Sequence, residues 1–387
     1  MQDNNQKPKI SNVKKIKFIF FTLLFLLIII MVISEIVLAI KGYPSIYAKM
    51  QEASLTQAKW WVCDSTAGPR YVPNQVDKTD SLVLKNQIWY YNRLKIVNNE
   101  GYHDKDNFTE IPSDSDSLRI LVDGDSFTWG ASSDVDSSYV EIFENDIKKN
   151  YPSIVWNTGI PGTGTNHALF TTKKYLPLQK SNYIILGFYT GNDFIDNLRP
   201  FDRLLFNNLA TCYNLYDYTS ELKPVIISKR EAYKKFTGSY PMEELNAIQK
   251  LLIKSRFITF ITEIKDKVLN RLSGNKKRTS EQEYKLTKEY LIQLNDYIKE
   301  NNAELIVYII PTSYDLNRKA AYYTNAVKIL SELGIKYIDN TAMFTANDYM
   351  GEGGHWINSG HIKAGHMLSK YLLDYIKEKQ QKTFKKQ

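Results

Sequence analysis

The chain of 387 residues is poor in cysteine and histidine, with two and five respectively. The spacing of Cys63 and Cys212 fits no metal site, and they could pair only in an oxidising compartment. The sequence leaves that disulfide open. His361 and His366 are five residues apart, which does not place two ligands side by side on a helix. We therefore interpret both as structural and expect no metal.

The body of the chain also lacks a surplus of positive charge. The formal net charge is +8, but residues 1–17 carry five lysines and one aspartate, and residues 376–387 carry five lysines and one glutamate. The residues between these tails are neutral, with 40 basic and 40 acidic side chains. A nucleic-acid-binding protein carries its basic residues on the folded domain. We therefore expect no nucleic acid as a partner.

A second long apolar run is absent, which limits the chain to one membrane span. Residues 18–40 would make a helix of about 35 Å, enough for a hydrocarbon core of ~30 Å. Five lysines precede this run, so the N-terminal tail, residues 1–17, is expected in the cytoplasm and the rest outside it. The alternative is a cleaved signal peptide, but its apolar region is usually shorter, about 7–15 residues, and ends at a cleavage site. No such site follows residue 34, and an uncleaved anchor is favoured.

Beyond the apolar run the composition predicts three further regions. Residues 41–117 show no sustained periodicity and predict an irregular stalk or cap. Residues 118–375 alternate between strand and helix patterns, apart from an insertion at about 194–280. Residues 376–387 form a basic tail.

The alternating pattern predicts a five-stranded parallel sheet covered by helices on both faces, a three-layer α/β/α sandwich. The run 182–189 is apolar on both faces, as a central parallel strand should be. The strands are expected at 120–122, 153–157, 182–189, 303–311 and 335–339.

Polar and flexible residues follow several of these strands. Ligand sites of open α/β sheets lie beyond the carboxyl ends of the strands. The first strand is followed by GDS, the second by NTGIPG, the third by GND and the last by GEGGHWINSGH. We expect Ser126, Gly162, Asn192 and His355 to meet at this edge.

These four residues supply what acyl transfer requires. A serine hydroxyl becomes a nucleophile when a base such as histidine takes its proton. The tetrahedral intermediate needs N–H donors for its oxyanion. The backbone N–H groups of Ser126 and Gly162 and the side-chain amide of Asn192 are suitable. Each residue alone has an ordinary structural interpretation, Ser126 as a helix cap, Gly162 as a turn residue and Asn192 in an Asx-turn.

The blocks GDSFTWG, NTGIPG, GND and HWINSGH, in this order, resemble the SGNH (GDSL-like) hydrolase superfamily over roughly residues 118–373. The resemblance implies a flavodoxin-like SGNH fold, Ser126 as nucleophile and His355 as base. It implies an oxyanion hole of Ser126, Gly162 and Asn192. We expect no cofactor.

The chain departs from that family around its last block. The family usually has an aspartate three residues before the histidine, where this chain has Glu352. Glutamate can orient an imidazole, and Asp348 is the alternative. Isoleucine stands at 357, where asparagine is common, and we assign Asn358 no role.

Four more residues are candidates for lining the site, and each has a structural alternative. Asp125 and Asp193 border the site or only hold its loops. His167 lines the pocket or lies on the surface at a helix start. Trp356 follows the predicted base. His361 is expected to pack beneath the site.

The sequence therefore predicts a membrane-anchored, extracytoplasmic serine esterase or O-acyltransferase. The expected substrates are O-acetyl esters of a cell-envelope or extracellular polysaccharide, and envelope polysaccharide machinery is an expected partner. A lipid or lysophospholipid esterase is the second hypothesis. The third is a non-catalytic glycan-binding or assembly protein on the same scaffold.

Overall fold

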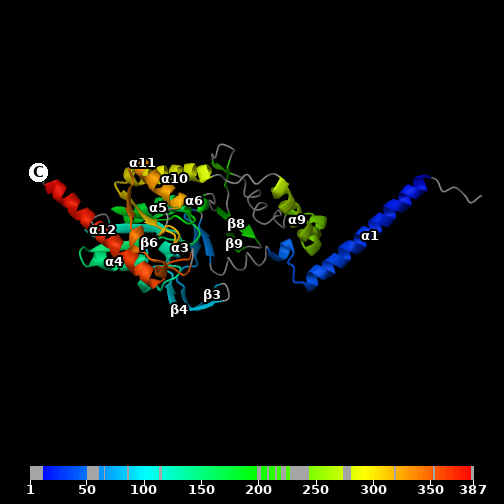
Figure 1. Cartoon of the computed structure of the whole chain (residues 1–387), viewed down its shortest axis with the longest axis horizontal. Helices are drawn as coiled ribbons and strands as arrows, with labels where there is room; N and C mark the ends of the chain where they lie inside the picture. The colour runs from blue at the N-terminus through cyan, green and yellow to red at the C-terminus, as the bar shows by residue number, and fades with distance from the viewer. Residues whose placement is uncertain are drawn as a thin grey trace, which may run out of the picture. The chain divides into compact units, whose positions relative to one another are not determined.

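The structure, a computed structural model, divides the chain into two compact units, Met1–Ala53 with Tyr233–Lys276, and Ser54–Ala232 with Lys277–Gln387 (Figure 1). The residues that it describes are 12–49, 61–64, 66–84, 87–112, 116–197, 202–206, 209–213, 216–218, 224–226, 244–272, 280–317, 320–351 and 354–384.

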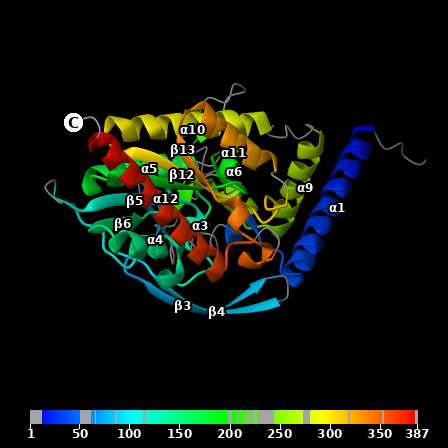
Figure 2. The ribbon, with the colours of Figure 1, turned by 60° about the vertical axis from the view of Figure 1, so that its left-hand side comes forward.

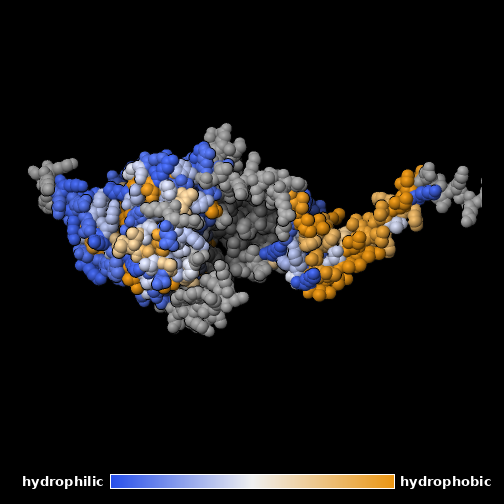
Figure 3. All heavy atoms as spheres, viewed as in Figure 1, coloured by the Kyte–Doolittle hydropathy of each residue, from blue (hydrophilic) through white to orange (hydrophobic). Residues whose placement is uncertain are grey.

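The first unit contains the apolar helix α1 (Asn12–Ile40) and the helices α8 (Ala247–Leu252) and α9 (Arg256–Leu272). Within the described part of the chain, one helix is long and apolar enough to cross a membrane, Val13–Ile40 of α1. Figure 3 shows its apolar surface. The sequence therefore correctly predicts one N-terminal apolar helix.

The second unit is built on a five-stranded parallel sheet, as predicted. Its order is β13-β12-β7-β5-β6, and every neighbouring pair is parallel. In chain order this is 2-1-3-4-5, the flavodoxin-like arrangement. The strands are β5 (Leu118–Gly124), β6 (Ser153–Asn157), β7 (Tyr183–Tyr189), β12 (Glu304–Ile310) and β13 (Lys336–Asp339).

The strand order locates the place where a ligand should bind. The connections leave β5 toward β6 on one side, while β7 pairs with β5 on the other. Loops therefore diverge beyond the carboxyl ends of β5 and β7, and this divergence opens a crevice. Ser126 and Asn192 directly follow these two strands.

Helices cover both faces of the sheet, and the alternation of side chains along the strands explains why (Figure 2). On β5, Ile120 and Val122 enter one apolar core and Leu121 enters the other. The first core includes side chains of α4 (Tyr139–Lys148) and α12 (Asn358–Phe384). The second includes side chains of α5 (Thr165–Gln179), α10 (Ser280–Glu300) and α11 (Ala321–Glu332).

The segment before the sheet contains regular strands, where the sequence led us to expect irregular structure. The pairs are β1 (Trp61–Asp64) with β2 (Gly68–Tyr71), and β3 (Val76–Leu84) with β4 (Gln87–Ile96). Both pairs are hairpins of neighbouring segments, and apolar and polar residues do not alternate regularly along their strands. Aromatic residues that favour strands are frequent in them. The segment joins the core, since the Phe108 ring stacks on Trp156 with centroids 4.4 Å apart.

The predicted insertion contributes to both units. Its described strands belong to the second unit. They are β8 (Asp202–Phe206), β9 (Leu209–Tyr213), β10 (Tyr216–Tyr218) and β11 (Pro224–Ile226). Its helices α8 and α9 belong to the first, and the helical pattern predicted there is confirmed.

Candidate active site

The turn after β5 holds Ser126 at the edge of the sheet. Asp125 caps the short helix α3 (Ser126–Trp129), and its Oδ1 accepts a hydrogen bond of 2.9 Å from the Phe127 amide. Gly130, with a φ of 75°, ends the helix in the left-handed conformation. Ser126 therefore sits at the first position of a helix, where a backbone N–H has no intrahelical partner. Its side chain is 8% exposed.

Ser126 and His355, which are 229 residues apart in the sequence, meet at this edge. The distance from His355 Nε2 to Ser126 Oγ is 2.7 Å. The same hydroxyl lies 3.4 Å from Oδ2 of Asp125, a much weaker hydrogen bond. The geometry therefore suits transfer of the hydroxyl proton to the imidazole.

Asp348 shapes the loop that carries His355. Its carboxylate accepts hydrogen bonds from Ser359 Oγ at 2.8 Å and Lys363 Nζ at 2.7 Å, and also from Thr345. Its backbone carbonyl accepts the amide of Ile357. These contacts direct the carboxylate to the start of α12. Glu352, the other candidate for orienting His355, lies outside the described residues.

A buried aromatic layer supports the loop from below. Trp356 is fully buried, stacks on Phe344 at 4.8 Å and meets Phe127 edge-on at 5.0 Å. His361 is also buried, and its Nδ1 accepts the Tyr139 amide at 3.3 Å. Trp356 thus lies beneath the site. His361 packs there as expected, while His366 pairs with Asp146 at the surface.

The glycine loop after β6 packs tightly against the serine turn. A Cβ added to Gly159 would lie 2.6 Å from both Thr128 Cβ and the Trp129 backbone nitrogen. Gly162 has a φ of 76°, and a Cβ there would meet nothing within 4 Å. Gly159 therefore allows close packing of two backbones, whereas Gly162 provides a turn that opens onto free space.

Replacing Gly159 with alanine should destabilise the second unit by about 2 kcal/mol or more, because backbone atoms of α3 must move. Gly334→Ala is the matched control. Its φ is 60° with open space around it, so only backbone strain of about 1 kcal/mol is expected. Denaturant unfolding measures both. Equal losses would show that the close approach at Gly159 is unimportant.

Asn192 follows β7 and is held by the next helix, α6 (Asp193–Asp196). Its Nδ2 donates to Asp196 Oδ2 at 2.7 Å. An amide nitrogen carries two hydrogens, so this bond fixes the amide and leaves a second N–H, which faces Asp125. Asn192 also donates toward Asp125 and lowers the pKa of that carboxyl.

Buried carboxyls surround this amide. Burial raises the pKa of Asp125 to about 7, with a further contribution from the charge of Asp196. Burial and the charges of Asp125 and Asp196 raise the pKa of Asp193 well above its ordinary value. The raised pKa favours the neutral form of Asp193, whose Oδ2 accepts the Tyr189 amide at 3.1 Å. Fewer negative charges then oppose an oxyanion nearby.

A third buried carboxyl, Asp123, gives a pH-dependent stability. Burial raises its pKa to about 7, although it accepts hydrogen bonds from Thr171, Thr158 and the Gly124 amide. Because the folded pKa lies above the unfolded value of 3.8, the folded state binds more protons between the two values. Stability therefore falls as pH rises from about 4 to about 7 and then levels off.

The variant Asp123→Asn should lack this dependence. The unfolding free energy of Asp123→Asn minus that of the wild type should increase by up to about 4 kcal/mol between pH 4 and pH 8. Denaturant titrations of both proteins across this range measure the difference. Parallel curves would contradict the ionisation of Asp123 as its source.

His167 is buried at the start of α5, near the backbone carbonyls of Ala67 and Pro69, and burial lowers its pKa to about 4. It is therefore neither on the surface nor a base at neutral pH. The side chains of Cys63 and Cys212 are outside the described part. Among the described residues, no cluster of histidine, cysteine and acidic side chains could hold a metal ion.

Asn157 is a site-forming residue that the sequence analysis did not identify. Its Nδ2 donates to the carbonyls of Thr128 at 3.0 Å and His103 at 3.1 Å, and its Oδ1 accepts the Gly159 amide at 3.0 Å. Its own amide donates to Asp104. Asn157 thus ties the serine turn, the glycine loop and the preceding segment together. The signal in the sequence is an asparagine at the end of the predicted strand 153–157.

Comparison with known proteins gives matches of structure alone. No family model matches the sequence, and no curated protein does. The fold matches solved structures over about two thirds of the chain. One is described as a lipolytic protein of the G-D-S-L family from Desulfitobacterium hafniense, with 10% identity, 66% of this chain, 99% of the other and a TM-score of 0.35.

Two further matches are esterases by description. The psychrotrophic esterase from Pseudoalteromonas has 10% identity, covers 68% of this chain and 98% of its own, and has a TM-score of 0.36. The lipase/acylhydrolase from Enterococcus faecalis has 13% identity, covers 66% and 94%, and also has a TM-score of 0.36. The chemistry of the site is therefore assigned from the residues of this chain.

Proposed function

We propose that the chain is a membrane-anchored, extracytoplasmic serine esterase or O-acyltransferase that acts on O-acetyl esters of a cell-envelope or extracellular polysaccharide. The observation that carries this proposal is the 2.7 Å contact between His355 Nε2 and Ser126 Oγ. It lies at the carboxyl edge of a parallel sheet, beside the point where the strand order reverses.

In the first half of the reaction, Ser126 Oγ attacks the ester carbonyl carbon while His355 Nε2 takes its proton. The carbonyl oxygen becomes an oxyanion, which accepts hydrogen bonds from the backbone amides of Ser126 and Gly162 and from Asn192 Nδ2. The Asn192 N–H that faces Asp125 turns to the oxyanion in this step, while the other stays on Asp196. Collapse of the intermediate breaks the bond to the alcohol oxygen. The alcohol leaves with the proton from His355, and the acyl group stays on Ser126.

In the second half, His355 takes a proton from water or from a sugar hydroxyl. That oxygen attacks the acyl carbon, and Ser126 leaves with the proton returned by the imidazole. With water as the acceptor the protein acts as an esterase, and with a sugar hydroxyl as the acceptor it acts as a transferase. Glu352 is proposed to orient His355 through its other ring nitrogen.

Contacts of α1 support retention of this helix as an anchor. Glu35 caps the start of α9, because its carboxylate accepts the amides of Arg256 and Phe257 at 3.0 Å each and Ser255 Oγ at 2.8 Å. A cleaved signal peptide would take this cap away from the folded unit. The lysines before the span place the N-terminus in the cytoplasm.

Replacing Glu35 with alanine should therefore loosen the start of α9 by about 1 kcal/mol, as for the loss of a helix cap. Hydrogen exchange of the full-length protein in lipid nanodiscs measures this. Faster exchange is expected at residues 256–260, with no change in α10. Unchanged exchange at α9 would contradict the capping role.

The tyrosines of the cap and the insertion, with the tryptophans of the cap, support a glycan substrate, since aromatic faces are common in carbohydrate contacts. The test uses the full-length protein in nanodiscs. Its substrates are an acetylated polysaccharide and p-nitrophenyl esters with acetyl or long acyl chains. Ser126→Ala is the matched control.

Release of acetate that is lost in Ser126→Ala supports the proposal. A preference for long chains favours the lipid esterase. The absence of both turnover and transfer to added acceptor glycan favours a non-catalytic protein. Either of the last two results would overturn the proposed function.

A further inference from the structure

We propose that α1, α8 and the start of α9 form a groove, the α1–α8 groove, that holds an acyl chain of a phospholipid from the outer leaflet of the bilayer. This inference rests on the proposed function only in that α1 must be retained and span the membrane. It assigns the first unit a lipid-binding role in addition to anchoring.

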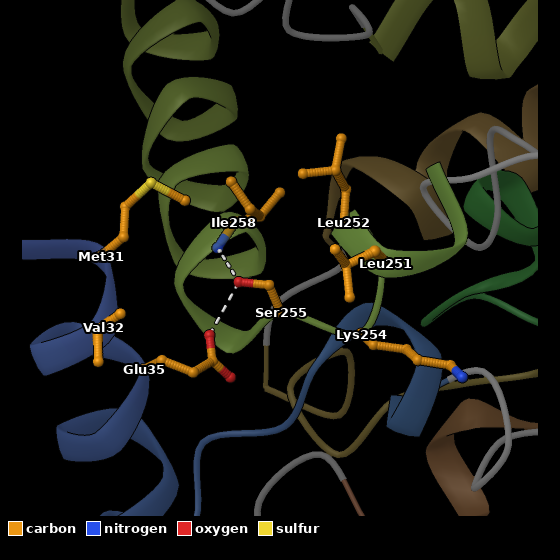
Figure 4. A pocket seen from close by; sticks show the side chains of 8 residues that line it. All are labelled: Met31, Val32, Glu35, Leu251, Leu252, Lys254, Ser255 and Ile258. Atoms are coloured by element: carbon orange, nitrogen blue, oxygen red, sulfur yellow. Dashed lines mark hydrogen bonds between the residues drawn. The ribbon is translucent and has the colours of Figure 1, made fainter. Parts of the chain in front are cut away.

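The walls of the groove are fixed to one another by polar contacts at its end. Figure 4 shows Ser255 between the Glu35 carboxylate and the Ile258 amide, with hydrogen bonds of 2.8 and 3.2 Å. A further contact follows the span, where the Ile46 amide donates to Thr259 Oγ1 at 2.9 Å. The helix α9 is thus held against the outer end of α1, and the groove is part of the fold.

The surface between these fixed points is apolar. The groove has a volume of about 460 Å³, within the range of small-ligand sites. Figure 4 shows Met31 and Val32 on α1, across from Leu251 and Ile258. Its full lining is Met31, Val32, Glu35, Leu251, Leu252, Lys254, Ser255 and Ile258.

The depth of the groove identifies the occupant. Val32 lies eight residues before Ile40, the last residue of α1, or about 12 Å along the helix. A span with a hydrocarbon core of ~30 Å therefore places Val32 inside the hydrocarbon layer. A groove with one wall on the lipid-facing surface of the span opens to acyl chains. Ile248 and Leu251 are 69% and 70% exposed, and such side chains need an apolar neighbour at this depth.

Polar groups stand where the lipid headgroups should be. Lys254 extends from the end of the groove, and its Nζ lies 5.4 Å from the centre of the Tyr47 ring. Tyrosines are common at the membrane–water interface, and lysines there reach toward phosphates. Tyr43, just after the span, bonds Glu263 of α9. The apolar part of the groove thus faces the acyl chains, and the ammonium group of Lys254 faces the phosphate of the same lipid.

The experiment uses full-length protein in nanodiscs of phosphatidylcholine and phosphatidylglycerol, with the photoreactive residue p-benzoylphenylalanine at chosen positions. Leu252 is the test position and Ile292, on α10, is the matched control, since each is 39% exposed. Phe25, within α1, tests whether the apolar span itself lies in the bilayer. After irradiation, the expected result at Leu252 and Phe25 is a mass increase of one phospholipid, and Ile292 should show none.

The outcomes separate the two proposals. An adduct at Phe25 without one at Leu252 overturns the groove and leaves the anchor intact. No adduct at Phe25, or a chain lacking residues before the cleavage point, overturns the anchor. A protein adduct at Leu252 in place of lipid also overturns the groove. Leu251, which also lines the groove, is the second test position in case the change at Leu252 prevents folding, and the same mass increase is expected there.

Discussion

Replacement of Ser126 with alanine should lower kcat for an acetyl ester by at least about 10³-fold, without loss of stability. The hydroxyl is the atom that bonds the acyl group, and no other group in the described site is placed to replace it. His355→Ala should have a similar effect, because the neutral hydroxyl is a poor nucleophile without a base 2.7 Å away. Steady-state kinetics on the full-length protein measures both.

The double variant is the sharper test. If Ser126 and His355 act as one unit, removing both should cost no more than removing either. If the fold losses in kcat of the two single variants multiply in the double variant, this would contradict a step that the two residues share. Asp348→Asn is the control within the same loop, since its carboxylate binds Ser359 and Lys363, and it should change stability more than kcat.

Replacing Asn192 with alanine should lower kcat by about 10²–10³-fold with a small change in KM, the effect expected for a lost oxyanion donor. Asn192→Asp should be at least as harmful, since a carboxylate would face the developing charge. Kinetics with the acetyl ester measures both. A rise in KM with unchanged kcat would contradict the role.

Asp196→Asn tests how the amide is held. Its side-chain oxygen can still accept from Asn192 Nδ2, so the loss in kcat should be well below that of Asn192→Ala. A loss as large as that of Asn192→Ala would instead show that the carboxylate charge matters. Thermal unfolding of each variant separates catalytic loss from misfolding.

The parallel sheet was predictable because each strand is a short apolar run bounded by turn residues, with helical patterns between. The central strand β7 is apolar throughout, and this composition alone distinguishes it as a buried strand. The ribbons β1–β2 and β3–β4 were not predictable in the same way. Both ribbons are local hairpins, but apolar and polar residues do not alternate regularly along their strands, so the pattern of a half-buried strand is missing.

The meeting of Ser126 and His355 was predictable because each follows a strand, and parallel strands end at one edge. The contribution of Asn157 was not, since the three hydrogen-bond partners of its side chain come from three separate segments. Trp356 illustrates the same limit. Its neighbour His355 reaches the serine, but whether a tryptophan lines a pocket or supports it depends on packing that the sequence does not display.

The central claim is that Ser126 is a nucleophile activated by His355, and covalent labelling tests it most directly. The full-length protein is treated with a fluorophosphonate, and the modified residue is located by peptide mass spectrometry. The account predicts one adduct, on Ser126, which forms far more slowly in His355→Ala. No adduct, an adduct on another residue, or labelling of Ser126 at the same rate without His355 would contradict it.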